Sequence, residues 1–151
     1  MSKSVTAAPT SDRFAGALTI ATALASLALL ATHPGGGQAR NFAELVQEEA
    51  RNQLQNLVVH GGYIFVGALQ IFCFSVLSSR LNGVRLASRA AIIFFAIGIA
   101  WRSISFLFDG LVTPAIAVRY VDQPDTAYSL FALITAIVRF AMPIALTFQA
   151  F

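Results

Sequence analysis

The chain has 151 residues, of which 57% are hydrophobic and only 11% are charged, with a formal net charge of +3 at pH 7. Soluble domains carry about twice this share of charged residues, so the composition argues against a water-soluble globule and predicts a protein solvated by lipid. No basic patch interleaved with aromatic residues accompanies the positive charge, which argues against a nucleic-acid partner.

Apolar segments of the length that crosses a bilayer as an α-helix, about 20 residues, recur along the chain. None of them alternates between apolar and polar residues as a barrel strand does. We therefore predict an all-α fold, a polytopic membrane protein built as a four-transmembrane-helix bundle. A single domain over residues 13–151 follows a polar cytoplasmic tail at residues 1–12. The spanning helices are expected at residues 14–32, 57–79, 90–108 and 127–150.

The first loop is predicted to contain an extra helix. Pro34 and the glycines at 35–37 end the first span and turn the chain. Asn41, with Glu44 three residues later, fits a capping box, and apolar residues then recur at helical spacing. This pattern predicts an amphipathic interfacial helix at about residues 42–56, in the first outer loop.

The segment after the third span has two readings. Pro114 has no N–H to donate to the carbonyl of Gly110, so we expect a kink or a break there. Either the third helix continues in a bent form through residues 110–121, or those residues form a separate interfacial segment. The fourth span should begin with Asp125 or Thr126 as its N-cap.

Basic residues near the span ends predict the orientation. Five lie on the side of the N-terminus and three lie on the other side, which predicts that both termini face the cytoplasm. The membrane is expected to be a bacterial inner membrane. The five are Lys3, Arg13, Arg80, Arg85 and Arg89, and the three are Arg40, Arg51 and Arg119.

Polar side chains inside the spans are the candidate ligand-binding residues. They share the helix faces that we expect to point toward the bundle centre. The guanidinium of Arg102 is expected to reach the carboxylate of Asp109, which leaves a cationic intramembrane pocket near the outer face. The candidates are His60, Tyr63 and Gln70 in the second span, Arg102, Ser105 and Asp109 in the third, and Thr135 and Arg139 in the fourth.

Three interpretations of these buried polar groups stay open. They pair with one another and fix the helix register, or they bind an electron-rich or anionic group, or a partner protein donates the missing acid. A lipid phosphate, a quinone carbonyl, a haem propionate or a small carboxylate would each suit the second interpretation.

No metalloprotease, paired-carboxylate, nucleophile–base or phosphate-loop signature is present, so the sequence favours a non-catalytic protein. The expected function is binding of a lipid- or quinone-like ligand, or a role as accessory subunit of a membrane complex. The expected partners are membrane lipids and a larger membrane complex or a homo-oligomer. One alternative is a haem-binding electron carrier with His33 and His60 as axial ligands. Another is a small anion or proton transporter that works as an oligomer. Nothing in the sequence requires a cofactor.

The layout resembles small uncharacterised four-span bacterial inner-membrane proteins of unknown function. The shared features are His33–Pro34 after the first span, His60 at the start of the second, and Asp109–Gly110 with Pro114–Ala115 after the third. The resemblance implies the four-span topology and brings no activity with it.

Overall fold

The computed structural model describes residues 10–34, 39, 41–79 and 85–150, and these form an all-α bundle without strands, as predicted. Most of the predicted polar tail and the glycines at 35–37 lie outside the described residues. The same holds for Lys3, Arg40 and Arg80, on which the orientation argument partly depends.

Within the described residues, four helices are long and apolar enough to cross a membrane, which identifies a multi-pass membrane protein. The first, second and fourth along the chain are single elements, and the third runs from Leu86 to Arg119 through three consecutive helical elements. The long helices are α1 (Thr10–Ala31), α3 (Gln53–Ser78), α4 (Arg85–Leu107) and α6 (Pro124–Gln149).

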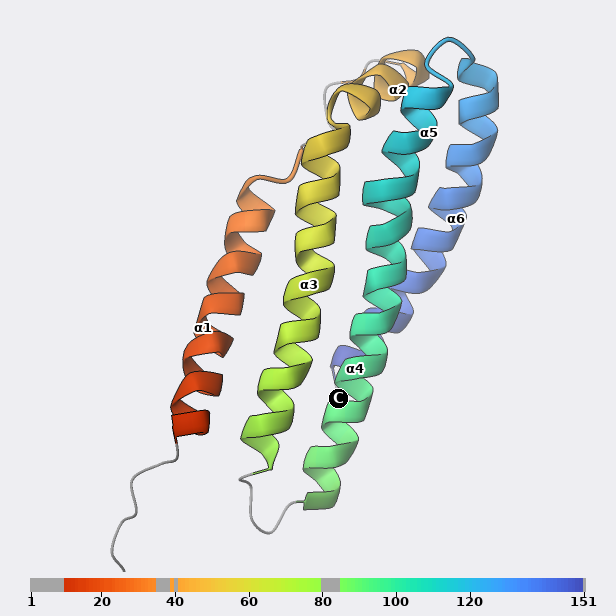
Figure 1. Ribbon diagram of the computed structural model, residues 1–151. Coiled ribbons are helices and arrows are strands. Elements are labelled where there is room, and N and C mark those ends of the chain that lie inside the picture. Colours follow the sequence, from red (N-terminus) through yellow and green to blue (C-terminus); the bar gives the residue numbers. More distant parts are fainter. Residues whose placement is uncertain (1–9, 35–38, 40, 80–84, 151) are drawn as a thin grey trace, which may run out of the picture.

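The four long helices pack in a row (Figure 1). Within the described residues α1 packs only on α3, α3 packs on α4, and α4 packs on α6, with no contact between α1 and α6 or between α3 and α6. A row leaves two broad helix faces without neighbours in the chain. Large apolar side chains such as Leu24, Phe65 and Phe140 are more than 60% exposed there, as suits a surface covered by lipid or protein.

The short helix α2 (Phe42–Arg51) covers one end of the row, which we call the α2 end (Figure 1). Its N-cap is confirmed, because the side-chain oxygen of Asn41 accepts from the backbone N–H of Glu44 at 2.9 Å. Phe42 and Val46 pack against Ala127 and Phe131 of α6. The helix is shorter than predicted, because Asn52 ends it and α3 begins at Gln53.

Pro114 neither breaks nor ends the third spanning helix. A π-helical turn, η1 (Phe108–Val112), precedes α5 (Thr113–Arg119), so the helix continues to Arg119. The backbone N–H and the hydroxyl of Thr113 both donate to the carbonyl of Phe108, the latter at 3.0 Å. Of the two expected alternatives the structure therefore has the continued third helix, with the wider turn directly before Thr113 and Pro114.

The start of α6 differs from the prediction. The helix begins at Pro124, and its N-cap is Gln123 without a side-chain cap hydrogen bond, whereas Asp125 lies in the first turn. A proline at the first helical position needs no N–H partner and has its φ angle already set for a helix. Pro124 therefore starts the helix two residues earlier than it would start with Asp125 as its N-cap.

Candidate ligand-binding site

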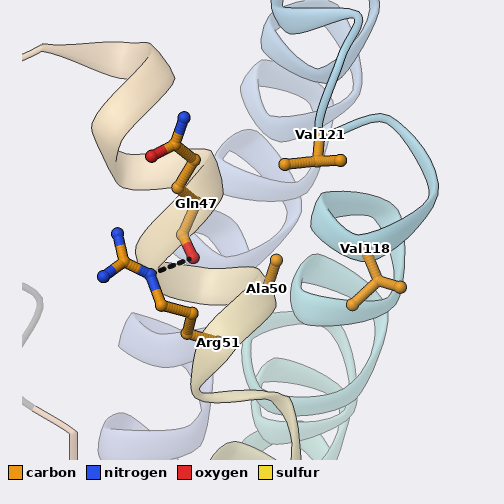
Figure 2. Close-up of a pocket in the computed structure, with 5 residues that line it drawn as sticks. All are labelled: Gln47, Ala50, Arg51, Val118 and Val121. Atoms are coloured by element: carbon orange, nitrogen blue, oxygen red, sulfur yellow. Dashed lines mark hydrogen bonds between the residues drawn. The ribbon is translucent and has the colours of Figure 1, made fainter.

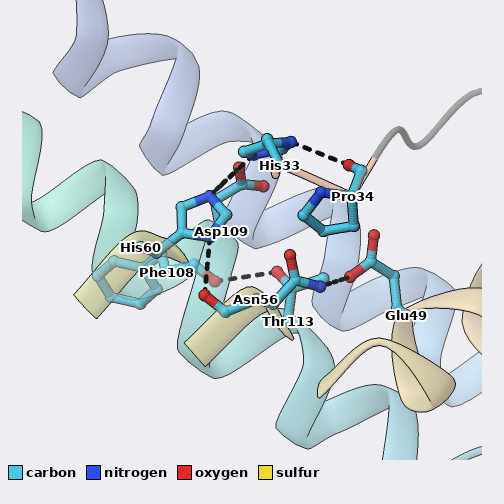
Figure 3. A network of polar contacts seen from close by, with 8 residues as sticks. All are labelled: His33, Pro34, Glu49, Asn56, His60, Phe108, Asp109 and Thr113. Carbon is cyan, nitrogen blue, oxygen red and sulfur yellow. Dashed lines mark hydrogen bonds and ion pairs between the residues drawn. The ribbon is translucent and has the colours of Figure 1, made fainter. Parts of the chain in front are cut away.

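The two histidines of the chain meet at the α2 end (Figure 3). His33 follows α1 and His60 lies in the second turn of α3, and their Nε2 atoms are 3.3 Å apart. The rings are in edge contact, with centroids 4.9 Å apart and planes inclined by 68°. His33 is exposed, whereas the His60 side chain is only 3% exposed.

The other nitrogen of each ring faces a backbone carbonyl. Nδ1 of His33 lies 2.9 Å from the oxygen of Pro34, and Nδ1 of His60 lies 3.0 Å from the oxygen of Asn56. A carbonyl oxygen can only accept, so both Nδ1 atoms carry the proton and donate it. In the neutral rings, both Nε2 atoms therefore present a lone pair, and they present it to each other.

Asp109 adds a carboxylate to this pair. Its Oδ2 lies 3.5 Å from Nε2 of His60, and its side chain is 58% exposed. The next residue, Gly110, is buried directly against the imidazole of His60, where no Cβ atom would fit. The π turn and Gly110 thus bring the backbone of the third span close enough to set Asp109 beside His60.

Glu49 and Asn56, which the sequence did not single out, lie beside these residues. We call the five together the histidine cluster, namely His33, Glu49, Asn56, His60 and Asp109. The amide of Asn56 donates to a carboxylate oxygen of Glu49 at 2.9 Å. Burial, followed by repulsion from Asp109 and Glu48, raises the pKa of Glu49. Asn56 stands one turn before His60, which is the only signal by which the sequence could have indicated it.

The other candidates of the second and third spans lie further from the α2 end. Tyr63 is half-buried, stacks on Phe106 and donates its hydroxyl to the carbonyl of Ser26 at 3.1 Å. Gln70 is half-buried on α3. Ser105 is 2% exposed, and its hydroxyl oxygen has no hydrogen-bond partner among the described residues.

The expected ion pair between Arg102 and Asp109 is not formed among the described residues, where Oδ2 of Asp109 lies 3.5 Å from Nε2 of His60 instead. Two helical turns, a rise of about 10.5 Å, separate Arg102 from Asp109 along the helix, whereas His60 faces Asp109 directly from α3. Arg102 is half-buried, and its Nε is buried without a hydrogen-bond partner in the described structure.

A double-mutant cycle checks this correction. Arg102→Leu and Asp109→Asn should change the free energy of unfolding in detergent additively, within about 0.5 kcal/mol, because the two side chains share no contact. The matched cycle of His60→Asn with Asp109→Asn should show a coupling of about 0.5 kcal/mol or more. A coupling above about 1 kcal/mol in the first cycle would restore the pair with Arg102.

Thr135 and Arg139 do not point toward the bundle centre as predicted. Both are exposed on α6, whose packing contacts come from residues such as Ile134, Ala141 and Ala145. The prediction assumed a closed bundle with one interior, but the helices form a row, so a face of α6 stays without a neighbour. The two arginines therefore do not form one cationic pocket.

Two cavities of the described structure lie away from these arginines. One of about 470 Å³ opens between α2 and α5 and is lined by Gln47, Ala50, Arg51, Val118 and Val121 (Figure 2). The Nε of Arg51 donates to the backbone oxygen of Gln47 at 3.3 Å. Another of about 660 Å³ lies between α3 and α4 near Phe74. Neither is lined by Arg102 or Arg139.

The histidine pair does not fit a haem. Axial ligation by His33 and His60 would place the porphyrin plane between the two rings, and rings in direct contact leave no layer for it. Comparisons with known proteins add no assignment, since no protein-family model matches the chain and no curated protein or solved structure is significantly similar to it.

Proposed function

We propose that the protein is a non-catalytic subunit of a membrane complex, and that it binds its partner through the face of α6 that bears Arg139. The observation that carries this proposal is an exposed guanidinium near the middle of a membrane-spanning helix. In this proposal the chain lies in a bacterial inner membrane with both termini in the cytoplasm, as its basic residues indicate.

The depth of Arg139 makes contact with lipid costly. At a rise of about 1.5 Å per residue, it lies about 15 Å from the end of α6 at Gln149 and about 22 Å from the end at Pro124. Both distances exceed the reach of a single side chain, so the guanidinium does not extend past either end of the helix. An arginine left among acyl chains at this depth costs roughly 3 kcal/mol. A carboxylate on a neighbouring helix would remove that cost.

A second copy of the chain does not supply this carboxylate. The seven acidic residues of the sequence are Asp12, Glu44, Glu48, Glu49, Asp109, Asp122 and Asp125. Asp12 stands in the first turn of α1, and the others gather at or near the α2 end, so none reaches the depth of Arg139. The partner is therefore a different protein with an Asp or Glu near the middle of a spanning helix.

The surface around Arg139 suits such a helix. Leu133, Phe140 and Leu146 are each more than 50% exposed on α6, and no other long helix of the chain except α4 packs on α6. Binding of a lipid- or quinone-like ligand between the arginines has less support, because Arg102 and Arg139 stand on different helices with different exposure.

The test is native mass spectrometry of the protein extracted in mild detergent from its own membrane. The wild-type chain and Arg139→Lys should carry the same spanning partner, and Arg139→Gln should lose it. Arg119→Gln, which changes an exposed arginine outside the middle of the membrane, should keep it. Loss in Arg119→Gln as well would show that the effect is not specific to mid-membrane charge.

Charge reversal makes the test specific. The partner must have an Asp or Glu in the middle of a spanning helix. Changing that acid to Arg should abolish the association of the two proteins. Combining this change with Arg139→Asp should restore the association. Wild-type protein that is extracted with lipid alone, or an Arg139→Gln variant that keeps the partner, would overturn the proposal. Equal melting temperatures of the variants would show that the losses do not come from unfolding.

A further inference from the structure

We propose that His33 and His60 bind a divalent transition-metal ion of the zinc type through their Nε2 atoms, with Asp109 as the third ligand. The proposal is independent of the partner surface on α6, because the two sites share no residue. It depends on three observations at the α2 end, namely the tautomers of the histidines, their separation, and the position of the carboxylate.

The tautomers leave the Nε2 lone pairs of His33 and His60 facing each other. Each Nδ1–H donates to a backbone carbonyl. When both rings are neutral, the two Nε2 atoms, which both carry a negative partial charge, lie 3.3 Å apart. A positive species between them removes the conflict. Metal-bound histidines almost always donate their other ring N–H to a carbonyl or a carboxylate, as both rings do here.

The separation of the two Nε2 atoms fits a tetrahedral centre. Zinc binds imidazole nitrogen at about 2.0–2.1 Å, so two nitrogens at neighbouring corners of a tetrahedron lie about 3.3–3.4 Å apart. The measured separation is 3.3 Å. Imidazole nitrogens are ligands that zinc, copper and nickel share, whereas magnesium and calcium prefer oxygen, which fixes the class of metal.

The third ligand needs a small movement. Among the described residues no group of three or more His, Cys, Asp or Glu side chains is placed so that it could hold a metal ion without a movement. Asp109 lies 3.5 Å from Nε2 of His60, and its side chain is 58% exposed, so it is free to rotate toward the ion. Glu49 lies close enough for Asp109 to raise its pKa, after the larger effect of burial, and a cation there would reduce this repulsion.

The site is also built to hold His60 in place. The ring of His60 packs on Phe106 with centroids 5.6 Å apart, and the backbone of Gly110 lies directly against the same ring. His33 is exposed and completes the pair from the segment after α1. The buried ring thus fixes one ligand, and the exposed ring and the exposed carboxylate can close over an ion from the membrane surface.

The experiment is calorimetric titration of the full-length protein in detergent with Zn²⁺, after purification through a tag without histidine. We expect one ion per chain and at least tenfold weaker binding in His33→Gln and in Asp109→Asn. Asp122→Asn, which changes an exposed acid near the same end, should bind as the wild type does. Co²⁺ should give the absorption of a tetrahedral nitrogen–oxygen site, and His33→Gln should abolish it.

A wild-type chain that binds no Zn²⁺ would assign the positive species to a proton shared by the two rings, and would overturn the proposal. Binding that is unchanged in His33→Gln would also overturn it, since the ion would then lie elsewhere. His33 is exposed, and a melting temperature equal to that of the wild type confirms that His33→Gln is folded.

Discussion

Replacing Gly110 by alanine is expected to lower the melting temperature of the protein in detergent by roughly 6–12 °C. A Cβ atom on Gly110 would overlap the imidazole of His60, whose side chain is only 3% exposed. The ring cannot move aside without losing the carbonyl of Asn56 and the contact with His33. Overpacking of this kind costs about 3 kcal/mol, and each kcal/mol lowers the melting temperature of a chain of this size by about 2–4 °C.

Gly61→Ala is the matched control for this change. It introduces the same methyl group beside His60 in the sequence, but a Cβ atom there meets nothing within 4 Å. Alanine favours a helix over glycine by about 1 kcal/mol, so Gly61→Ala should keep or raise the melting temperature. If Gly110→Ala melts like the wild type, the imidazole does not pack on Gly110. The Cβ atom of His60 is in the way as well as its ring, so a partial recovery in Gly110→Ala combined with His60→Gly would identify the His60 side chain as the obstacle.

Gly98→Ala should lower the melting temperature by roughly 3–8 °C. Gly98 is buried where α4 crosses α6, and a Cβ atom there would lie 2.9 Å from the backbone oxygen of Ala145. The side chain of Gln149, which is also in the way, can rotate, but the carbonyl can yield only if the two helices separate. Small residues allow spanning helices to approach this closely, and their enlargement costs packing along the crossing.

The control for Gly98→Ala is Gly16→Ala in α1, where a Cβ atom again meets nothing within 4 Å. Thermal unfolding followed by circular dichroism should rank Gly16→Ala at or above the wild type and Gly98→Ala below it. Adding Gln149→Ala should restore little of the loss, because the obstacle is backbone. Full restoration would show that only the side chain of Gln149 stands in the way.

The four spanning helices could be predicted from sequence because hydrophobic length is a local property. The four apolar segments became four long helices, and Asn41 capped α2 as its spacing with Glu44 indicated. His60 and Tyr63 also face the neighbouring third span, as predicted, since a period of 3.6 residues fixes relative faces within one helix.

The relations between helices could not be predicted in the same way. Nothing in a single helix tells whether its neighbours close into a ring or stand in a row, so Thr135 and Arg139 were assigned to an interior that α6 does not face. The pairing of His33 with His60 depends on how the segment after α1 lies over α3, which is likewise a long-range property.

The path of the chain around Pro114 was open in the sequence for a local reason. A proline excludes one hydrogen bond, and a kink, a break or a wider turn each satisfies that constraint. The structure has the wider turn, with the N–H of Thr113 bonded to the carbonyl of Phe108. The composition of the five residues before Thr113 does not distinguish these outcomes.

This wider turn separates two properties of the third spanning helix. A hydrogen bond from residue i to i+5 encloses one residue more than the α-helical bond does, so Phe108–Val112 stores a spare residue between two regular segments. A chain shortened by one amino acid at this point can close the ordinary helical bond while the segments on both sides keep their partners. The helix can thus keep its span across the bilayer while the position of the Asp109 carboxylate beside the His60 imidazole changes. The deletion of a single codon is enough to make that change.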